Sequence, residues 1–338
     1  MKTLSKQRST LADVARRAGV SIVTASRALN DHPFVAQATR ERILAARAAL
    51  NYVPNLLARG LVQNRTATVG VIIPEIANPF FAPMVGGIQA VAAKRRFLVL
   101  VGESARDEAE ERRYVEQFRQ FRIGGIIVNP STSDLGHLLA ARAAGTPVVA
   151  MAWSWANGDS VATDDVHGGQ LVGRHFLERG HRRIGLVRLA DARHAPVQAR
   201  VRGFRDMLAS DGVSLRHPWD LQVQGVQIED GIEAARRLLA CRPRPSAVFT
   251  TNDRVAIGII QELLEHGIRV PEDIAVVGYD DIPYATAARV PLTTVAVPKR
   301  SLGEQAAELM FRRYDGRGTL RHKQIRLAPE LVVRGSSP

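Results

Sequence analysis

The sequence predicts an α/β fold in which a small N-terminal helix-turn-helix headpiece precedes a larger core of doubly wound parallel sheets. Residues 11–30 have the pattern of two short amphipathic helices joined at one glycine. From Thr68 onward, strands and helices alternate through two successive cycles of similar size. We therefore expect two similar α/β lobes with a cleft between them.

The two headpiece helices are defined by spacing and by turn chemistry. Small or apolar residues at positions 11, 14, 15 and 18 share one helix face. Gly19 tolerates the positive φ of a sharp turn, and Ser21 is a good N-cap for the second helix. That helix is expected to expose a set of side chains suited to base edges in a major groove: Ile22, Val23, Thr24, Ser26 and Arg27.

Charge favours a DNA-binding role over the alternative, a two-helix packing unit with no contact to DNA. Residues 1–65 contain eleven Lys or Arg and three acidic residues, so they carry +8 of the chain's +13. Clustered positive charge attracts the phosphate backbone and releases its condensed counterions.

A third helix and a linker complete the N-terminal part. Residues 39–50 have a helical pattern that Thr39 can cap, and Pro54 ends it. Asn55 can cap a further short helix within residues 55–67, but so short a helix is marginal in water. The sequence therefore predicts a headpiece at 1–54 and a linker at 55–67 that orders on contact with a partner.

The core begins at residue 68. In the first cycle we expect strands at 68–74, 97–103, 124–130 and 147–152, with helices at 78–96, 107–121 and 134–145. In the second we expect helices at 166–180, 199–212, 228–241 and 253–267, followed by strands at 183–190, near 221–225, at 246–252 and at 273–281. The tail after residue 298, with a helix expected at 301–314 and a strand at 325–334, is too short for a lobe and is expected to cross back. The first lobe would hold about 68–163 and 294–324, and the second about 164–293 and 325–338.

Several function classes are disfavoured. The single cysteine, Cys241, permits no internal disulfide and no cysteine metal site, and it is expected to be a packed apolar residue. The basic N-terminus has no apolar signal region and no stretch is long enough to cross a membrane, so we expect a cytoplasmic protein without membrane contact. The chain carries none of the common nucleotide-binding or hydrolase motifs. We therefore expect neither an enzyme nor a bound cofactor or metal.

The whole chain resembles the lactose-repressor (LacI/GalR) family of bacterial transcription regulators. The segments that carry the resemblance are, in family order, LADVARRAGVS, TASRALN, LNYVPN, GVIIP, NPFF, ERGHRRIG, TNDRVAIG, VPEDIAVVGYDD and PLTTV. The resemblance implies a headpiece, a hinge helix and a two-lobed core like the periplasmic sugar-binding proteins. It also implies a homodimeric repressor of palindromic operator DNA, controlled by a small molecule, expected to be a carbohydrate, between the lobes. The sequence has no C-terminal leucine heptad, so a dimer is expected rather than a tetramer.

The resemblance also implies DNA-contacting residues. Ile22 and Val23 would lie at the main base-reading positions, and Arg27 resembles an arginine that contacts bases. Leu61 matches a hinge leucine that enters the minor groove. The full expected set is Ser21, Ile22, Val23, Thr24, Ser26, Arg27, Asn30, Asn55 and Leu61. Two features depart from the family pattern. Apolar residues 22 and 23 favour contact with thymine methyl groups, and Gly60 weakens the hinge helix by about 1 kcal/mol.

The effector site is expected where the carboxyl ends of the strands face the cleft. The expected contacts are Asn78, Phe80, His167, Arg200, Asn252 and Asp280. Arg200 matches a family arginine that holds ligand hydroxyls or a carboxylate. Alternatives remain open: Arg200 and Asp280 can form a structural ion pair, Phe80 and Phe81 can be core, and His167 can serve only the start of its helix.

Trp153 and Trp155 follow a strand, and their spacing would turn one inward and one outward. One rival function uses the same lobes: a sugar-binding transport protein without a regulatory role. It would need a signal peptide and would not need the headpiece, so the N-terminal residues argue against it.

Overall fold

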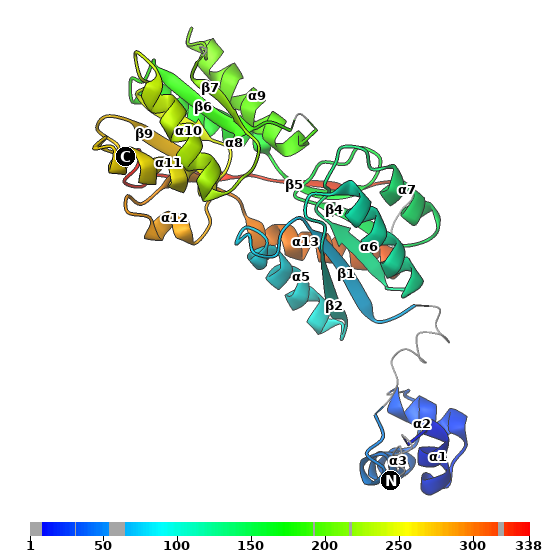
Figure 1. Cartoon of the computed structure of the whole chain (residues 1–338). Helices are drawn as coiled ribbons and strands as arrows, with labels where there is room; N and C mark the ends of the chain where they lie inside the picture. The colour runs from blue at the N-terminus through cyan, green and yellow to red at the C-terminus, as the bar shows by residue number, and fades with distance from the viewer. Residues whose placement is uncertain (1–8, 31, 54–64, 192, 216–217, 317–320) are drawn as a thin grey trace, which may run out of the picture. The chain divides into compact units, whose positions relative to one another are not determined.

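The computed structural model describes residues 9–30, 32–53, 65–191, 193–215, 218–316 and 321–338. The chain forms two compact units, the first ending at Thr66 and the second beginning at Ala67 (Figure 1). Within these described ranges, no helix has both the length and the apolar composition needed to cross a bilayer.

The first unit contains the predicted helix-turn-helix. Its helices are α1 (Leu11–Ala18), α2 (Ile22–Leu29) and α3 (Gln37–Ala49). Gly19 ends α1 with a φ of 65°, and the Ser21 Oγ accepts a hydrogen bond from the N–H of Thr24 at 3.1 Å, so both predicted roles are confirmed. The start of α3 differs from the prediction. It begins two residues before Thr39, after Ala36, which provides no side-chain cap.

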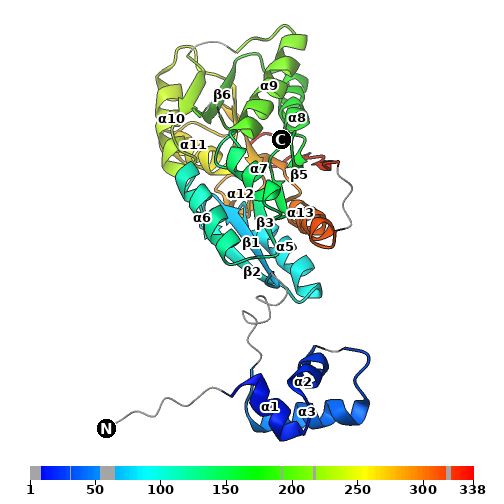
Figure 2. The same cartoon turned by 90° about the vertical axis from the view of Figure 1, so that its right-hand side faces the viewer.

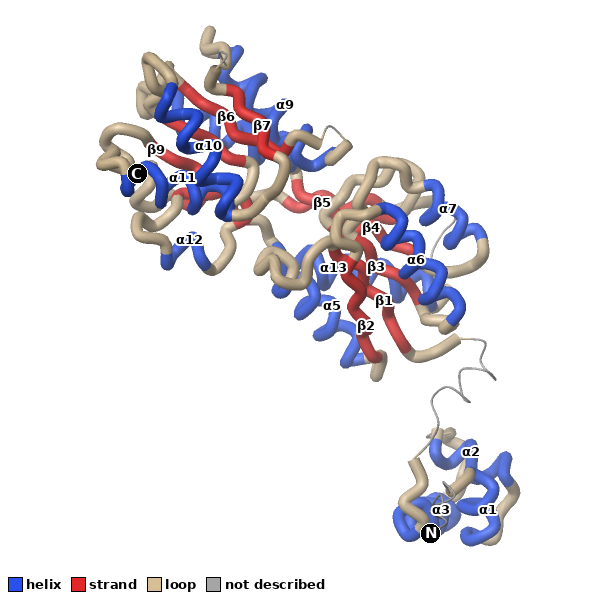
Figure 3. Tube along the Cα trace, in the orientation of Figure 1, coloured by secondary structure: helices blue, strands red, loops and turns tan. Residues whose placement is uncertain are grey.

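The second unit contains two six-stranded sheets, each enclosed by helices (Figure 3). The first sheet has the strand order β11-β5-β4-β3-β1-β2, and the second has the order β12-β10-β9-β8-β6-β7. Every strand pair is parallel except β10 with β12. Two doubly wound α/β lobes are therefore confirmed. The elements of the first lobe are β1 (Thr68–Ile73), α5 (Ala82–Lys94), β2 (Leu98–Glu103), α6 (Glu108–Gln120), β3 (Gly125–Val128), α7 (Gly136–Ala143), β4 (Val148–Met151), β5 (Asp159–Thr163), α13 (Lys299–Tyr314) and β11 (Gln324–Leu327).

The second lobe repeats this layering. Its elements are α8 (Asp165–Glu178), β6 (Ile184–Leu189), α9 (Ala195–Ser210), β7 (Asp220–Val223), α10 (Ile228–Ala240), β8 (Ala247–Thr250), α11 (Asp253–Glu265), β9 (Ala275–Asp280), α12 (Tyr284–Ala287), β10 (Thr293–Ala296) and β12 (Glu330–Val332). Helices α8 and α9 pack together, as do α10 and α11. In the first lobe, α5 and α13 cover one face of the sheet, and α6 and α7 cover the other (Figure 2).

The tail crosses between the lobes as expected, but at slightly different points. Strand β10 pairs with β9 in the second sheet, and β11 pairs with β5 in the first. The crossings therefore fall after β10 and after β11, within a few residues of the approximate boundaries expected. Cys241 is buried at the end of α10, as expected.

Helices α8 and α9 touch through glycines. A Cβ built on Gly203 of α9 would lie 1.9 Å from the Val166 carbonyl oxygen, and one on Gly169 of α8 would lie 2.0 Å from the Arg200 carbonyl oxygen. Both obstructing atoms belong to the backbone and cannot rotate away. The absence of side chains at these two positions therefore sets how closely the two helices approach.

We expect Gly203→Ala to lower the free energy of unfolding by about 1–3 kcal/mol, because the added methyl must separate α8 from α9. Gly86→Ala in α5 is the matched control, since its Cβ would have no neighbour within 4 Å. That variant should be neutral or more stable by about 0.5–1 kcal/mol through helix propensity. Urea unfolding of both variants is the measurement. Equal stability of the two would contradict the packing argument.

Candidate functional site

Helix α2 presents the side chains expected to read DNA. Ile22 and Val23 are 53% and 59% exposed, which is unusual for aliphatic residues beside a core. Arg27 is exposed, and its guanidinium makes no hydrogen bond or ion pair to any other described residue. Ala25 and Ala28 form the opposite, buried face. Helix α2 therefore packs against the rest of the first unit through Ala25 and Ala28, and its longer side chains project outward.

The remaining residues of the expected DNA set fall into three groups. Thr24 and Ser26 are half-buried. The Thr24 Oγ1 lies 2.8 Å from the Ser21 Oγ, so the hydroxyls of Ser21 and Thr24 also serve the start of α2. Asn30 is exposed at the C-cap of α2. Asn55, Leu61 and the rest of the expected hinge lie outside the described residues.

A cavity lies between the two lobes of the core, at the carboxyl ends of the parallel strands. The centre of a water-sized sphere can occupy about 60 Å³ of it, room for a few water molecules, and the cavity opens to solvent. Five of the six expected effector contacts line it: Asn78, Phe80, Arg200, Asn252 and Asp280. The strand-end rule therefore located the cavity correctly. Whether these residues bind a ligand stays a prediction.

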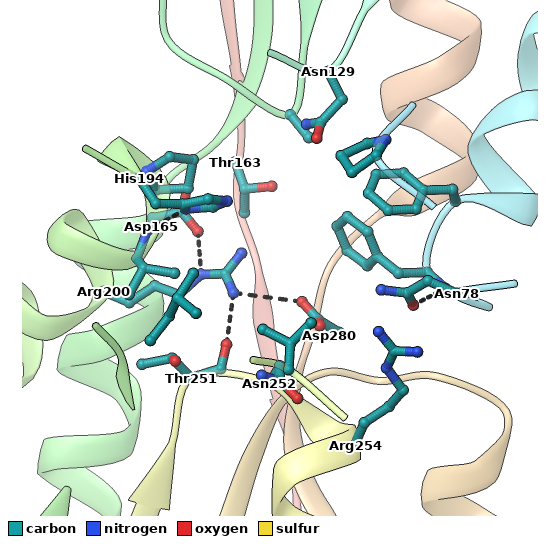
Figure 4. A pocket seen from close by; sticks show the side chains of 18 of the residues that line it. Asn78, Asn129, Thr163, Asp165, His194, Arg200, Thr251, Asn252, Arg254 and Asp280 are labelled. Carbon is teal, nitrogen blue, oxygen red and sulfur yellow. Dashed lines mark hydrogen bonds and ion pairs between the residues drawn. The ribbon is translucent and has the colours of Figure 1, made fainter. Parts of the chain in front are cut away.

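Arg200 is the centre of the cavity's polar wall (Figure 4). Its Nε donates to the Asp165 Oδ1 at 2.8 Å, and its Nη1 donates to the Thr251 carbonyl at 2.8 Å and lies 3.5 Å from the Asp280 Oδ1. The guanidinium carbon stacks 3.8 Å from the centre of the Tyr279 ring. Arg200 therefore does pair with Asp280, as one alternative proposed, but its closer partner is Asp165.

Asp280 is held in a strained backbone conformation. Its φ is 119°, and that of Asp281 is 53°, both values that side-chain-bearing residues rarely adopt. The Lys299 ammonium donates to the carbonyl oxygens of both residues, and the N–H of Ile282 donates to the Asp253 Oδ2 at 2.8 Å. Lys299 belongs to the first lobe, so a contact across the lobes fixes the aspartate that faces the cavity.

The other expected contacts also have local roles. The Asn78 Oδ1 accepts from the N–H of Phe80 at 3.0 Å and fixes the turn that precedes α5. The Asn252 Oδ1 caps α11 by accepting from the N–H of Val255 at 2.9 Å. This leaves the Asn252 amide nitrogen with no hydrogen bond to a described residue. Phe80 and Phe81 are both largely buried in the core and also line the cavity, so the two interpretations of these rings hold together.

His167 is the one expected effector contact that does not reach the cavity lining. The His167 N–H donates to the Asp164 Oδ1 at 3.1 Å, which is the helix-start role named as its alternative. The expectation that Trp153 and Trp155 face opposite ways is wrong: they are 2% and 4% exposed and both pack in the first lobe. Residues two apart on a strand point to the same face, so the spacing of the two tryptophans favoured one common direction; both follow β4 and are buried in the same cluster.

The structure adds lining residues that the sequence prediction did not select. These are chiefly Arg106, Asn129, Thr163, Asp165, His194 and Arg254. Most of them follow a strand of the parallel pattern, so the strand-end rule would have found Asn129 and Thr163. Arg106 and His194 lie several residues beyond their strands, and only the folded loops bring them to the cavity. No group of three or more His, Cys, Asp or Glu among the described residues could hold a metal ion.

A second contact joins the lobes beside the cavity. Arg254 of α11 makes a bidentate ion pair with Glu75, which follows β1, with N–O distances of 3.0 and 2.7 Å. The Gln227 Nε2 donates to the same carboxylate at 3.2 Å. The hydrogen bonds from Arg254 lower the pKa of Glu75, so this carboxylate stays ionised at neutral pH. The pair favours the arrangement in which the two lobes approach each other.

A helix-turn-helix unit and a two-lobed α/β core with a cavity between its lobes define a class of DNA-binding regulators that respond to small molecules. The comparisons agree with this class. Residues 10–55 match the model for bacterial regulatory proteins of the lacI family, and residues 174–337 match a periplasmic binding protein-like domain.

Relatives of known function extend the match to nearly the whole chain. The HTH-type transcriptional repressor PurR of Photobacterium profundum is 34% identical over 97% of this chain and 98% of its own length. The Ribose operon repressor of Escherichia coli is 34% identical over 97% of this chain and 100% of its own length.

Solved structures show the same architecture. The lac repressor dimer bound to operator and the anti-inducer ONPF has a TM-score of 0.87 and 27% identity, over 98% of this chain and 99% of that one. The complex of the regulator CelR with cellobiose has a TM-score of 0.73 and 31% identity, over 97% and 100% of the two chains.

The chain belongs to the LacI family of bacterial regulatory proteins. It is accordingly a DNA-binding transcriptional repressor with an effector-binding core of the periplasmic-binding-protein type, and not an enzyme. The sequence-based predictions of family, fold and regulatory function are confirmed.

The charge of Asp280 generates a pH prediction. Burial, opposed by Arg200 and Lys299, raises the pKa of Asp280 to about 6 from its ordinary value of 3.8. Folding therefore favours the protonated carboxyl, and this contribution to stability is complete below pH 3.8 and is lost as the pH rises through about 6. We expect Asp280→Asn, which removes the buried charge, to melt at a higher temperature than wild type above pH 6.

Thermal melts of both proteins across this pH range are the measurement. The difference in Tm should shrink toward zero as the pH falls to about 4. Asp206→Asn is the control, because it removes an exposed carboxylate of α9. A Tm difference that does not change with pH would show that the Asp280 carboxyl titrates as it does in the unfolded chain.

Proposed function

We propose that this protein binds a palindromic operator as a homodimer and releases or engages it when a carbohydrate binds between the core lobes. The observation that carries this proposal is the cavity itself: side chains from both lobes line it. A ligand that contacts both lobes stabilises their approach, and differential affinity for two arrangements is what couples a ligand to DNA binding. Because its target is chromosomal DNA, we place the protein in the cytoplasm.

We propose that residues 1–54 form the DNA-binding headpiece, with α2 in the major groove. Ile22 and Val23 would contact thymine methyl groups, and Arg27 would donate to a base edge. Ser21, Thr24, Ser26 and Asn30 would seat the helix on the phosphates. Support comes from the exposure of residues 22, 23 and 27 and from the excess of positive charge in this part of the chain.

The linker has its own part in this proposal. Residues 55–67 would form a hinge that Asn55 caps and that becomes helical on DNA. Leu61 would then enter the minor groove and kink the operator. A segment of this length gains stability as a helix mainly from its contacts, which supports ordering on DNA.

We propose that Asn78, Phe80, Arg200, Asn252 and Asp280 contact the effector, with His167 nearby. Carboxylate and amide groups bind paired hydroxyls, and an aromatic ring covers the apolar face of a sugar. The relatives support this class of ligand, since one is named for a ribose operon and another is in complex with cellobiose.

The dimer is supported by an exposed apolar strip on the first lobe. Strand β2 is at the edge of its sheet, and its residues Leu98, Leu100 and Val101 are 59%, 44% and 40% exposed. An edge strand with exposed aliphatic side chains favours pairing with another chain. The lac repressor, whose fold resembles this chain over nearly its whole length, was solved as a dimer.

The base-contact role of Arg27 is tested by Arg27→Ala. We expect operator affinity to fall about tenfold to a hundredfold, the worth of one base-edge contact, with folding unchanged. Binding to random DNA at low salt should change little, because the remaining positive charge is directed at phosphates. Arg42→Ala is the control, since it removes an exposed charge from α3 and not from the recognition helix. Gel shifts with operator and random DNA measure both, and an unchanged ratio between them in Arg27→Ala would exclude this contact.

The dimer surface is tested by Leu98→Glu. A buried carboxylate at a subunit interface is costly, so we expect the variant to shift from dimer to monomer and to lose tight operator binding. Phe121→Glu is the matched control, because Phe121 is 61% exposed but follows α6 and is not on β2. Light scattering at micromolar concentration gives the mass of each. If Leu98→Glu remains a stable dimer, β2 is not part of the interface. If the wild type is a tetramer, the proposed dimer is wrong.

A further inference from the structure

We propose that the effector is an anionic sugar derivative, a sugar carboxylate or a sugar phosphate, whose anionic group binds Arg106 and the Nε2–H of His194. This inference deepens the proposed function and rests on it in one respect, namely that the cavity between the lobes is the effector site. It assigns a chemical class to the ligand and a subsite to two residues that the sequence prediction did not select.

Arg106 is the arginine of the cavity lining for whose donors the described residues provide no acceptor. Three arginines line the cavity, and two of them are occupied. Arg200 is bound to Asp165 and the Thr251 carbonyl, and Arg254 is bound to Glu75 through two nitrogens. The guanidinium of Arg106 makes no hydrogen bond or ion pair with the part of the chain that the structure describes. Its five N–H groups therefore need an acceptor from solvent or from a ligand.

The carboxylates near Arg106 already have cations of their own. Glu75 is held by Arg254, and the Asp191 Oδ1 lies 3.3 Å from the Nε of Arg193. Asp280 faces Arg200. Among the described residues no carboxylate forms an ion pair with Arg106, although Glu75, Asp280 and Asp191 lie near enough to favour its charged form. A carboxylate or phosphate pairs with a guanidinium through two parallel hydrogen bonds, which neutral hydroxyls cannot match in strength.

His194 adds a second free donor. Its Nδ1 accepts from the N–H of Val197 at 3.4 Å and so caps α9. Burial first, and then the charges of Arg106 and Arg200, lower the pKa of His194 to about 3, so the ring is neutral. A neutral ring that accepts at Nδ1 carries its proton on Nε2. This N–H has no partner among the described residues, and the side chains of Arg106 and His194 line the same cavity.

The backbone holds Arg106 in a strained turn. Ala105 and Arg106 have φ values of 50° and 61°, consecutive left-handed conformations at residues that are not glycine. Strained turns of this kind cluster at ligand sites, where the surrounding structure fixes them. Here the turn is anchored directly after Arg106 by Asp107, which caps α6 through a 2.6 Å hydrogen bond from the N–H of Ala109.

The cavity therefore has two chemically different parts. Asp280 presents acceptor oxygens that suit hydroxyl groups, whereas Arg106 and His194 present donors alone. His194 and the Asp280 carboxylate lie on opposite sides of the Arg200 guanidinium (Figure 4). A molecule with hydroxyls at one end and an anionic group at the other satisfies both parts, and a neutral sugar leaves the charge of Arg106 unpaired.

The experiment compares matched neutral and acidic probes with the full chain in the absence of DNA. The pairs are D-galactose with D-galacturonate, D-glucitol with D-gluconate, and D-ribose with D-ribose 5-phosphate. We expect the acid of at least one pair to raise the Tm while its neutral counterpart does not, because only ligands that bind the folded state stabilise it. The carboxylate pairs and the phosphate pair distinguish the two sources of the anionic group.

Variants then locate the subsite. By calorimetry, Arg106→Gln should weaken binding of the active acid by about tenfold or more, through loss of a charge-assisted pair. His194→Asn keeps a helix-capping side chain and removes the imidazole N–H, and it should weaken the same acid several-fold. Arg202→Gln is the control, because it removes an exposed charge from α9 outside the cavity lining and should leave binding unchanged.

Three outcomes would overturn the proposal. These are equal or tighter binding of the neutral members, unchanged acid binding in Arg106→Gln, and no stabilisation of the wild type by any acid of the panel. Operator binding is measured separately by gel shift with the same preparations. Acid binding without operator binding would refute the proposed function alone, and operator binding that responds to a neutral sugar would refute this inference alone.

Discussion

The buried guanidinium of Arg200 is the interaction on which the core depends. A charge this deep in a protein is costly unless it is paired and hydrogen-bonded. Arg200 meets this requirement with partners from three elements: Asp165 at the start of α8, the Thr251 carbonyl after β8, and Asp280 at the end of β9. Because α8 and α9 touch backbone to backbone through glycines, the arginine has little freedom to move away. The same contacts that compensate the charge form the polar wall of the cavity.

The cavity is also the place where the lobes hold each other. Glu75 and Arg254 form an ion pair across it, Lys299 of the first lobe binds carbonyl oxygens beside Asp280 in the second, and the Ser133 hydroxyl donates to the Arg193 carbonyl. A ligand in this cavity would contact side chains that already join the two lobes. Its binding energy can therefore shift the balance between two lobe arrangements, which is the physical requirement for control of a distant DNA site.

The headpiece follows a different principle, because its core is small. Val14, Ala18, Ala28 and Ile43 make up most of the buried apolar cluster. Small residues let three short helices approach closely, and the tight turn at Gly19 sets the angle between the first two. This arrangement leaves the longer side chains of α2 exposed, so the apolar side chain of Ile22 stays in contact with water. Such exposure is understandable in a surface that is completed by another molecule.

Features that depend on neighbours along the chain were predictable from the amino-acid sequence. Helix caps such as Ser21, the turn at Gly19, the alternation of strands and helices, and the residues that follow strands belong to this group, because periodicity and turn chemistry are local. Asn252 and Asp280 reached the cavity for this reason. The folded chain was needed to show which distant groups meet: that Arg200 binds Asp165 more closely than Asp280, that both tryptophans are buried, and that Arg106 and His194 share the cavity. These outcomes depend on loop conformation and on packing between segments far apart in sequence, for which a linear pattern carries no signal.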